Sequence, residues 1–593
     1  MRIKNASVLW IIFCAVLVNS QGYAQQDVLP RGLSQEEKAL LKDYVTPVPE
    51  GTLSWAQVAG DGDFRAMAEW EELQAVVITW TSFPAILAEI VRSVRKECEV
   101  IIVCTNQGSV QNYLTNKGVD WSTNVTFVQG PFNSIWVRDY GPNTVYRHDV
   151  DSLFLVDWIY NRPRPKDDVL PSLIGSVLQI PVIGTTTAPD DLVHTGGNFM
   201  SDGMGTGFSS ELVLEENGPN NNYGFSNHSE AEVDEIMFNT MGIEPYVKMT
   251  NLPYDLIHHI DMHMKLIDEE TLIVGQYPNG IADGPQIEAN LQYVLSNFNS
   301  RFGTPFRVIR IPMPPDGSGK FPNQGGDYWT YANALIANRT VIVPTYSPQY
   351  DTTALRIWQE AMPGYTVTGI DCQDIIPLSG ALHCITKEVG VQDPLRIVHQ
   401  RIDGTNATPD GYLIDALIQH QSGINQAYVY YTTDTTAGFA EVAMVPSAEA
   451  DHFQGFIPVL SEGVDVFYYI AAEAKSGKMQ TRPLTAPSGF WTFSVPTSTS
   501  VDPDDQPGAE VQPVFPNPAS AITCIPIELD RQEDRLTVDL VDPLGRMTNL
   551  FQGDAPAGMK RIFFDAGQYP AGVYQVRVST ARGRSTQSLL IQP

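Results

Sequence analysis

One local pattern recurs between Trp70 and Lys387: a strand, a turn, a second strand and often a helix. In the first copy, residues 75–80 form an apolar run typical of a buried strand. Residues 83–97 carry apolar side chains at the spacing of an amphipathic helix, and 99–104 form a second apolar run. The pattern therefore predicts an α/β fold for this part of the chain.

The pattern returns twice more with the same order of elements. Predicted strand pairs cover 262–267 with 271–274 and 331–336 with 340–343, and predicted helices follow at 286–301 and 352–362. Repeats of strand, strand and helix predict a closed, pseudo-symmetric assembly rather than an open sheet. Strand ends converge at the centre of such a ring, where residues far apart in sequence share one site.

The chain changes character after about Pro394. Its 593 residues are too many for one domain, since domains hold roughly 100–200 residues. Short alternating or aromatic strands, as at 428–431 and 464–472, predict an immunoglobulin-like β-sandwich over 394–495. Residues 496–513 are rich in Ser, Thr, Asp and Pro and predict a linker. A small β-rich domain is predicted over 514–593.

The N-terminus has the layout of a secretory signal. Arg2 and Lys4 precede an apolar run at 8–18, and small residues precede a predicted cut after Ala24. The run is too short to span a bilayer, and no later apolar stretch is long enough. We therefore predict a signal peptide over 1–24 and an exported chain. The catalytic domain is predicted over 25–393, with a polar, proline-containing lead-in over 25–65.

Charge and cysteine content narrow the function classes. The formal charge of −31 argues against a nucleic-acid partner, because phosphate backbones need a basic face. An acidic surface would instead attract cationic, arginine-bearing peptides. Without the signal, five cysteines remain, an odd number that leaves at least one thiol free. Their spacing forms no zinc pattern, and we expect Cys98 and Cys104 to be buried thiols.

Three short segments carry reactive side chains: 136–142, 258–263 and 379–384. They contribute one thiol, one imidazole and two carboxylates. Two carboxylates suit a planar cation, because they grip a guanidinium through paired charge-assisted hydrogen bonds. A nucleophilic thiol needs a positive neighbour, such as an imidazolium or the bound cation itself. The segments therefore predict an enzyme that attacks arginine-like side chains.

Each segment alone has a structural alternative. Cys384 could be an inert buried thiol, and Asp139 could merely cap a turn. His259 and Asp261 stand two residues apart, so on a strand they would point to one face. That pair could equally be a metal-binding or structural pair.

The segments match the motifs of one family, in the same order along the chain. Trp-x-Arg-Asp-x-Gly-Pro at 136–142, Gly-Gly-Asn at 196–198, His-x-Asp at 259–261 and Gly-x-x-His-Cys at 380–384 follow one another. Over about residues 65–390 the chain resembles the bacterial agmatine deiminase and peptidylarginine deiminase family of the pentein superfamily. The resemblance implies a five-bladed α/β propeller.

The resemblance also implies roles for individual residues. By it, Cys384 is the nucleophile, His259 the general acid and base, Asp139 and Asp261 the guanidinium clamps, Asn333 a supporting residue near the thiol, and Trp136 an aromatic wall along the substrate stem. The implied reaction hydrolyses a guanidinium to a ureido group and ammonia through a covalent thiouronium on the cysteine. It needs no metal or organic cofactor.

The segment around Arg162 and Arg164 bears on the substrate. Each of these arginines precedes a proline, which favours extended backbone. They would repel the amine of agmatine and bind a carboxylate bidentately. The segment resembles that of Porphyromonas-type peptidylarginine deiminases, which implies preference for C-terminal arginine. However, Leu256 stands where that resemblance leads us to expect a carboxylate-holding tyrosine. Alternatively, the two arginines pair at the surface with Asp167 and Asp168.

The last 80 or so residues carry a second resemblance. Pro-Asn-Pro-Ala at 516–519, Leu-Gly-Arg at 544–546 and Gly-Val-Tyr at 572–574 resemble type IX secretion sorting domains. We therefore predict export through the periplasm by the type IX machinery, and a protein that is secreted or attached to the outer-membrane surface.

Three alternatives to a peptidylarginine deiminase remain. The first is a secreted agmatine deiminase that gives N-carbamoylputrescine. The second is a cysteine peptidase, which would use the thiol and imidazole but leave the two carboxylates without a role. The third is a non-catalytic surface adhesin. Intact Asp139, His259, Asp261, Asn333 and Cys384 argue against the adhesin.

Overall fold

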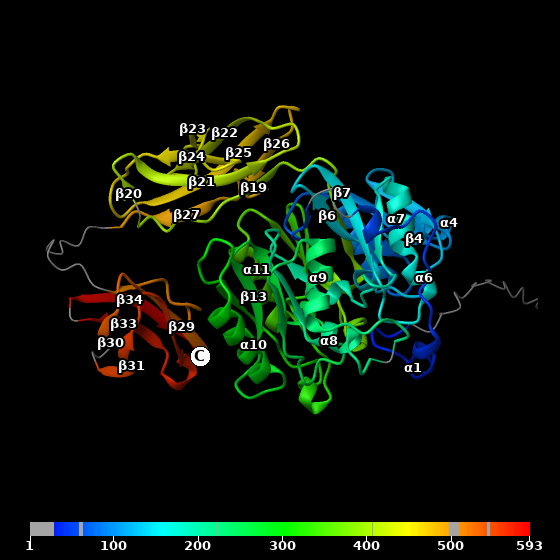
Figure 1. Ribbon diagram of the computed structural model, residues 1–593, viewed down its shortest axis with the longest axis horizontal. Coiled ribbons are helices and arrows are strands. Elements are labelled where there is room, and N and C mark those ends of the chain that lie inside the picture. The colour runs from blue at the N-terminus through cyan, green and yellow to red at the C-terminus, as the bar shows by residue number, and fades with distance from the viewer. Residues whose placement is uncertain are drawn as a thin grey trace, which may run out of the picture.

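The computed structural model describes residues 29–58, 63–221, 223–405, 407–496, 509–542, 546–580 and 582–592. The predicted signal peptide, most of the predicted linker and the Leu-Gly pair at 544–545 lie outside the described residues. Figure 1 shows a large α/β part, a β-sheet part in yellow above it, and a small red β part that ends the chain. Separate clusters of buried apolar side chains underlie these parts.

The described residues of the α/β part contain five separate sheets. The first holds β1 (Leu53–Ser54), β8 (Val182–Thr185), β7 (Ser152–Trp158), β6 (Asn143–Arg147) and β2 (Phe64–Ala66); the second β11 (Tyr246–Met249), β10 (Gly207–Ser210) and β9 (Met200–Ser201); the third β12 (Met264–Asp268), β13 (Thr271–Gln276) and β14 (Arg307–Pro312); the fourth β15 (Leu335–Ala337), β16 (Thr340–Thr345) and β17 (Thr366–Asp371); the fifth β18 (Lys387–Gly390), β3 (Leu73–Thr79), β4 (Glu99–Cys104) and β5 (Val125–Gln129).

Helices of the α/β part lie between these strands. They are α1 (Gln35–Leu40), α2 (Trp55–Val58), α3 (Pro84–Val94), α4 (Gln107–Asn116), α5 (Val137–Tyr140), α6 (Pro165–Asp168), α7 (Leu170–Leu178), α8 (Leu212–Asn217), α9 (Glu230–Met241), α10 (Gly284–Asn297) and α11 (Pro348–Ala361). In α3 the apolar residues at the predicted helical spacing are buried. None of the described helices is both long and apolar enough to cross a membrane.

The fifth sheet joins the two ends of the α/β part. β3, β4 and β5 are parallel neighbours, and β18 pairs antiparallel with β3. The last strand of this part therefore returns to one of its first strands. This pairing agrees with the predicted closed assembly, while the five-bladed propeller stays a prediction.

The predicted strand, strand and helix repeats are present with shifted bounds. The helix expected over 286–301 is α10, and the one expected over 352–362 is α11, which begins four residues earlier at Pro348. The strands expected to start at 262 and 331 begin only at Met264 and Leu335. The residues before both strands form turns of the site described below.

The part after Pro394 is all β in the described residues. Its strands are β19 (Arg396–Val398), β20 (Ala407–Thr408), β21 (Gly411–Gln419), β22 (Ile424–Thr432), β23 (Ala440–Pro446), β24 (His452–Ile457), β25 (Asp465–Ala474), β26 (Met479–Arg482) and β27 (Trp491–Ser494). Side chains alternate between buried and exposed along β25, as the sequence pattern predicts. The immunoglobulin-like assignment stays a prediction.

The final part contains two small sheets. They hold β28 (Ala509–Val511), β29 (Ile522–Leu529) and β32 (Gly558–Asp565), and β31 (Met547–Ala555), β30 (Glu533–Val541), β33 (Gly572–Ser579) and β34 (Arg584–Ile591). β28 falls inside the predicted linker, 496–513, and pairs antiparallel with β29. Residues 509–511 of the predicted linker are therefore part of a sheet. Ala509 is buried in the core of the final part.

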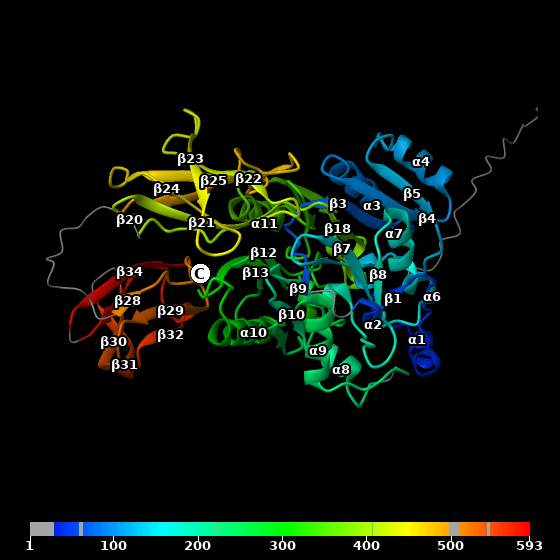
Figure 2. The ribbon, with the colours of Figure 1, turned by 45° about the horizontal axis from the view of Figure 1, so that its top comes forward.

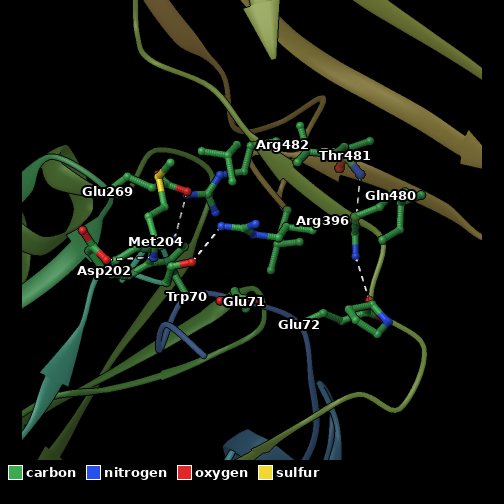
Figure 3. A pocket seen from close by; sticks show the side chains of 16 residues that line it. Trp70, Glu71, Glu72, Asp202, Met204, Glu269, Arg396, Gln480, Thr481 and Arg482 are labelled. Carbon is green, nitrogen blue, oxygen red and sulfur yellow. Dashed lines mark hydrogen bonds and ion pairs between the residues drawn. The ribbon is translucent and has the colours of Figure 1, made fainter. Parts of the chain in front are cut away.

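Ion pairs fasten the yellow β part to the α/β part. Arg482 contacts Glu269 at 3.0 Å, and Lys478 contacts Glu72 at 2.8 Å. Figure 3 shows the cavity at this seam, lined from both parts, with Arg482 directed toward Glu269. None of the predicted catalytic residues lines this cavity. The seam is therefore an interface, and the predicted site lies elsewhere.

Candidate active site

The short helix α5 places Asp139. Its side chain is buried, and the preceding Arg138 holds the helix in place. The Arg138 guanidinium forms two hydrogen bonds with the Glu388 carboxylate, at 2.8 and 2.5 Å, and a third with the His383 carbonyl at 3.1 Å. The segment that carries Asp139 is thereby tied to the segment around Cys384.

His259 and Asp261 lie on a turn and not on a strand. Residues Ile260–Met262 form the 3₁₀ turn η3, and β12 begins only at Met264. The physical reason is local: the buried Asp255 carboxylate accepts hydrogen bonds from the backbone N–H groups of Ile257 and His259. The same-face argument from strand geometry was therefore wrong, although both side chains do face one site.

The 3₁₀ turn η6 (His383–Ile385) carries Cys384. Asn333 lies in the bend before β15, and its Nδ2 is 3.1 Å from Cys384 Sγ. Its Oδ1 accepts a hydrogen bond from the backbone N–H of His383 at 3.1 Å. Asn333 thus contacts both the thiol and the backbone beside it. All five residues predicted as catalytic are buried together.

The site is filled by an arginine of the chain itself. Arg31, in the predicted lead-in, is 0% exposed, and its guanidinium lies among the predicted catalytic side chains. Its Nε and Nη2 donate to the two oxygens of Asp139 at 3.0 and 2.9 Å. Nη2 is 3.3 Å from Asp261 Oδ2, and Nη1 is 2.5 Å from Cys384 Sγ.

His259 contacts the same guanidinium from another side. Its Nδ1 is 2.7 Å from Arg31 Nη2, and its Nε2 is 3.1 Å from Thr195 Oγ1. A guanidinium has only donors, so Nδ1 must accept and the ring proton must lie on Nε2. His259 is therefore neutral in this arrangement, with its Nδ1 lone pair aimed at one terminal nitrogen of the guanidinium.

The site is electrostatically built for a cation. Burial disfavours the charged form of Arg31, but the carboxylates of Asp139 and Asp261 raise its pKa well above the usual value. Burial acts in the opposite sense on the two carboxyls, yet the Arg31 charge holds the pKa of both below the usual range. The guanidinium and both carboxylates are thus charged together.

The nucleophile and the base are both neutral. Burial raises the pKa of the Cys384 thiol well above its usual value, and the nearby carboxylates add to this, while Arg31 opposes it. Burial also lowers the pKa of His259, and the Arg31 charge lowers it further. The bound guanidinium is therefore the main neighbour that favours the thiolate here, and a backbone hydrogen bond at Ala381 adds a smaller effect.

Second-layer contacts orient Asp261. His383, adjacent to the nucleophile in sequence, has its Nδ1 2.8 Å from Asp261 Oδ2 and its Nε2 2.9 Å from Glu69 Oε1. Glu69 also pairs with Lys265 at 2.5 Å. Sequence reasoning missed His383 and Glu69. Only the position of His383 within the Gly-x-x-His-Cys motif could have pointed to it.

Gly197 leaves room for the guanidinium. A Cβ atom built on Gly197 would lie 2.1 Å from Arg31 Nη2, 2.6 Å from His259 Nδ1 and 2.8 Å from Asp139 Oδ1. Gly196 differs, because a Cβ there would lie 2.2 Å from the Arg138 backbone carbonyl oxygen. One glycine of the Gly-Gly-Asn motif therefore makes space for the cation and the other for the backbone.

The three predicted substrate-binding residues contact the backbone around Arg31. Arg162 Nε donates to the Arg31 carbonyl at 3.0 Å, and Arg164 Nη2 donates to the Pro30 carbonyl at 2.8 Å. The Trp136 indole N–H donates to the Leu29 carbonyl at 2.9 Å. Trp136 was predicted to line the substrate stem as an aromatic wall. The structure shows in addition that its indole binds the peptide backbone through a hydrogen bond.

The surface-pairing alternative for the two arginines was wrong. Asp167 accepts from the Ser134 hydroxyl and from backbone N–H groups, and Asp168 from the Tyr44 hydroxyl and the Tyr160 backbone. Leu256 is 82% exposed and lies away from the buried guanidinium. A leucine so exposed does not take the role of the carboxylate-holding tyrosine that the resemblance led us to expect there.

The Arg138–Glu388 pair gives a stability prediction. Both side chains are almost fully buried. Arg138→Met leaves the Glu388 charge buried and unpaired, so we expect the apparent free energy of unfolding, measured in urea, to fall by about 3–5 kcal/mol. The matched control is Arg356→Met, which breaks an exposed pair with Glu360 and should change it by about 0.5 kcal/mol or less. Equal losses would contradict the prediction.

The residues that build this site belong to a stretch of the chain that matches a known family. A family model described as Porphyromonas-type peptidyl-arginine deiminase matches residues 65–389, more than half of the chain. The chain belongs to this family. The match contains all eight residues predicted from sequence for catalysis and substrate binding. It does not contain Arg31, which lies before the matched residues.

Relatives of this deiminase family member carry other names. A protein of Vibrio parahaemolyticus, provisionally named agmatine deiminase, is 26% identical over 332 residues, covering 51% of this chain and 86% of that protein. A Legionella pneumophila protein with the same provisional name is 27% identical over 274 residues, covering 45% and 75%. The family model names peptidyl-arginine as substrate, whereas these two relatives are named after agmatine.

Two solved structures are among those similar to the chain, each at less than 25% identity. One, provisionally titled an arginine deiminase from Porphyromonas gingivalis, is 22% identical, with a TM-score of 0.48, and covers 55% of this chain and 98% of that chain. An agmatine deiminase of Enterococcus faecalis is 21% identical, with a TM-score of 0.47, covering 58% and 98%.

A second family model matches the C-terminal end of the chain. Residues 513–592 match the secretion system C-terminal sorting domain. The predicted sorting domain is thereby confirmed as to its kind, and it indicates export to the cell surface or the surroundings.

Proposed function

We propose that the protein is an exported peptidylarginine deiminase, which hydrolyses the guanidinium of peptidyl-arginine to citrulline and ammonia. The observation that carries the proposal is the contact set of Arg31. A peptide-borne guanidinium lies between Asp139 and Asp261, with Cys384 Sγ 2.5 Å from one terminal nitrogen. A cysteine peptidase would need the thiol near a backbone carbonyl instead.

Binding comes before chemistry in this proposal. Asp139 accepts two hydrogen bonds from the substrate guanidinium, and Asp261, oriented by His383, accepts from the same cation. Two charged partners fix the plane of the guanidinium and so present its central carbon to Cys384. The bound cation also favours the thiolate, so the substrate assists in forming its own nucleophile.

The first chemical half forms the covalent intermediate. Cys384 sulfur adds to the central guanidinium carbon, and its proton passes by way of His259 to the terminal nitrogen that faces His259 Nδ1. That carbon–nitrogen bond breaks, and neutral ammonia leaves. A positively charged thiouronium remains on Cys384.

The second half releases the product. His259 accepts a proton from a water molecule, whose oxygen adds to the thiouronium carbon. The carbon–sulfur bond breaks, the ureido product leaves, and the sulfur regains a proton. Over the whole reaction one guanidinium and one water give one ureido group and one ammonium ion. Asn333, 3.1 Å from Cys384 Sγ, supports the sulfur throughout.

Arg162 and Arg164 favour a peptide over agmatine. In the proposed complex they donate to backbone carbonyls on either side of the substrate's stem, as they do around Arg31. Agmatine would place an ammonium group before two guanidinium groups, which repel it. Because Arg162 contacts the carbonyl of an arginine within a continuous chain, a free C-terminal carboxylate is not required. Preference for C-terminal arginine remains a prediction.

The agmatine alternative rests on the names of the curated relatives. Ammonia release is to be measured on agmatine, free arginine, a peptide ending in arginine and a peptide with internal arginine. Because Arg31 fills the site, the assay uses both the mature chain and its Arg31→Gln variant. Turnover on the peptides above agmatine supports the proposal. Fastest turnover of agmatine would replace it with a secreted agmatine deiminase.

Arg162→Ala separates peptide from small-molecule substrates. Loss of one charge-assisted hydrogen bond costs about 1.5–3 kcal/mol, so kcat/KM on either peptide should fall roughly ten- to a hundredfold. Turnover of agmatine should not fall, since it has no carbonyl at that position. A loss on the C-terminal peptide alone would instead identify Arg162 as a carboxylate clamp.

The proposal includes finer statements on architecture and export. The five sheets with a closing β18 support a five-bladed propeller. The alternating burial along β21 and β25 supports an immunoglobulin-like sandwich. The sorting domain supports translocation by the type IX machinery with the tail removed or used for attachment. Fractionation that finds the full-length chain retained inside cells would contradict the export proposal.

A further inference from the structure

The N-terminal segment 29–37, termed the Arg31 segment, is bound like a peptide ligand. Four successive carbonyls along it, from Leu29 to Gly32, accept hydrogen bonds from the α/β part. The donors are the Trp136 indole and the Arg162 and Arg164 guanidinium groups. Contacts of main-chain groups combined with one buried side chain are how sites recognise extended peptides.

Contacts after Arg31 anchor the segment. Ser34 caps α1, and the Glu37 carboxylate that completes the capping box also pairs with Arg164 at 2.6 Å. Further along, the Tyr44 hydroxyl donates to Asp168. Figures 1 and 2 both show α1 beside α6, on the side of the molecule away from the two β parts. Arg164 therefore binds backbone before Arg31 and a side chain after it.

The Arg31 segment brings a guanidinium of the chain to the thiol and the imidazole of the same chain. Each terminal nitrogen of Arg31 faces a chemical group that the proposed reaction uses: Nη1 faces Cys384 Sγ and Nη2 faces His259 Nδ1. A tethered substrate reacts without the entropy loss of a second molecule binding, at a high effective concentration. Nothing further needs to be brought to the site except water.

We infer that Arg31 is a substrate of its own active site and that the chain deiminates it once, in cis; this rests on the proposed function. Cys384 sulfur bonds to the central carbon of the Arg31 guanidinium. The thiol proton passes through His259 to Nη2, the bond between Nη2 and the central carbon breaks, and ammonia is released. Water then adds its oxygen to the same carbon and the carbon–sulfur bond breaks; one water proton returns to the sulfur, the other is taken up by the released ammonia, and Arg31 is left as citrulline. No oxidant or cofactor takes part.

Conversion would also unblock the site. Citrulline is neutral, so the two buried carboxylates lose the charge that offsets their repulsion, and the charge-assisted hydrogen bonds donated by the Arg31 guanidinium are lost. The segment would then leave, and peptides from outside would enter. Arg31 thus blocks the site until its own reaction has occurred, and the first ammonia comes from the chain itself.

Mass spectrometry of the mature chain tests this inference. The peptide containing residue 31 should carry citrulline in the wild-type protein and arginine in Cys384→Ala. Arg65, held by Glu71 at 2.6 Å, should remain arginine in both and serves as the internal control. When dilute wild-type protein is mixed with labelled Cys384→Ala chains, residue 31 of the labelled chains should stay arginine, because the reaction is in cis.

A matched pair of variants tests the block. Arg31→Lys keeps a cation that cannot be deiminated, and Arg31→Gln stands in for neutral citrulline. A haloacetamidine probe, itself a cation, should label Cys384 faster in Arg31→Gln than in Arg31→Lys. Equal rates would overturn the block. Cys98, Cys104, Cys372 and Cys524 are buried and should remain unlabelled in both.

The outcomes separate this inference from the proposed function. If residue 31 of the wild-type chain stays arginine while Arg31→Gln converts an added peptide to citrulline, self-deimination is overturned and the proposed function stands. If citrulline appears at residue 31 of Cys384→Ala expressed alone, the modification comes from elsewhere and self-deimination is again overturned. If no variant releases ammonia from any substrate, both are overturned.

Discussion

Ammonia release from every guanidinium substrate is expected to disappear when Cys384 is replaced with alanine. The thiol is the only proposed group that forms a bond to the guanidinium carbon, so kcat/KM should fall by roughly 10⁴-fold or more. The Asp139 and Asp261 carboxylates remain, so binding of a guanidinium should persist. The measurement compares ammonia release with binding of an arginine peptide, both for Cys384→Ala on the Arg31→Gln background, where no internal arginine fills the site.

Cys98→Ala provides the matched control. Cys98 is a free, buried thiol that follows α3 and lies outside the cluster of site residues. Its loss should lower stability slightly and leave kcat/KM unchanged. If Cys384→Ala released ammonia at a rate close to that of Cys98→Ala, the guanidinium would be attacked without the Cys384 thiol, and the covalent route would be wrong.

Gly197→Ala is expected to remove activity with little effect on folding. The new Cβ would occupy the space taken by a guanidinium nitrogen, so kcat/KM should fall by roughly 10²-fold or more. The atoms that crowd it are the ends of the Arg31, His259 and Asp139 side chains, and not backbone. The melting temperature should therefore change little. Both quantities are to be measured on the Arg31→Gln background, where no internal arginine competes.

Gly196→Ala is the contrasting variant. Its Cβ would collide with the Arg138 backbone carbonyl, which cannot move without displacing α5. This variant should lose melting temperature and activity together. If Gly197→Ala binds arginine peptides as well as its parent does, the space beside Gly197 does not hold the guanidinium.

Local elements with a strong apolar pattern were predictable from sequence. The strand at 75–80 and the helix at 83–97 correspond to β3 and α3, because their spacing alone determines which faces are buried. The turns at the site were not predictable in this way. Residues 259–262 and the segment at Asn333 were predicted as strand starts. They form turns instead, because the His259 backbone N–H donates to the Asp255 carboxylate and the His383 backbone N–H donates to Asn333 Oδ1.

The predicted catalytic residues came from motif order, and the structure brings them together in one buried cluster. What sequence reasoning missed is Arg31. The lead-in is polar and without period, and Arg31 is separated from Asp139 by 108 residues and from Cys384 by 353. No local signal links such distant residues. Only the arrangement of the folded α/β part shows that an arginine between Pro30 and Gly32 reaches the site.

The pairing of β18 with β3 has a consequence for the order of events during export. Cys384 lies three residues before β18, so it can join the other site residues only when the C-terminal end of the α/β part has docked onto strands laid down near its beginning. A chain that is still being threaded, or one cut before residue 387, has its carboxylates and imidazole but no placed thiol. The proposed activity therefore requires the pairing that closes the α/β part, and an incomplete copy of the protein should lack it.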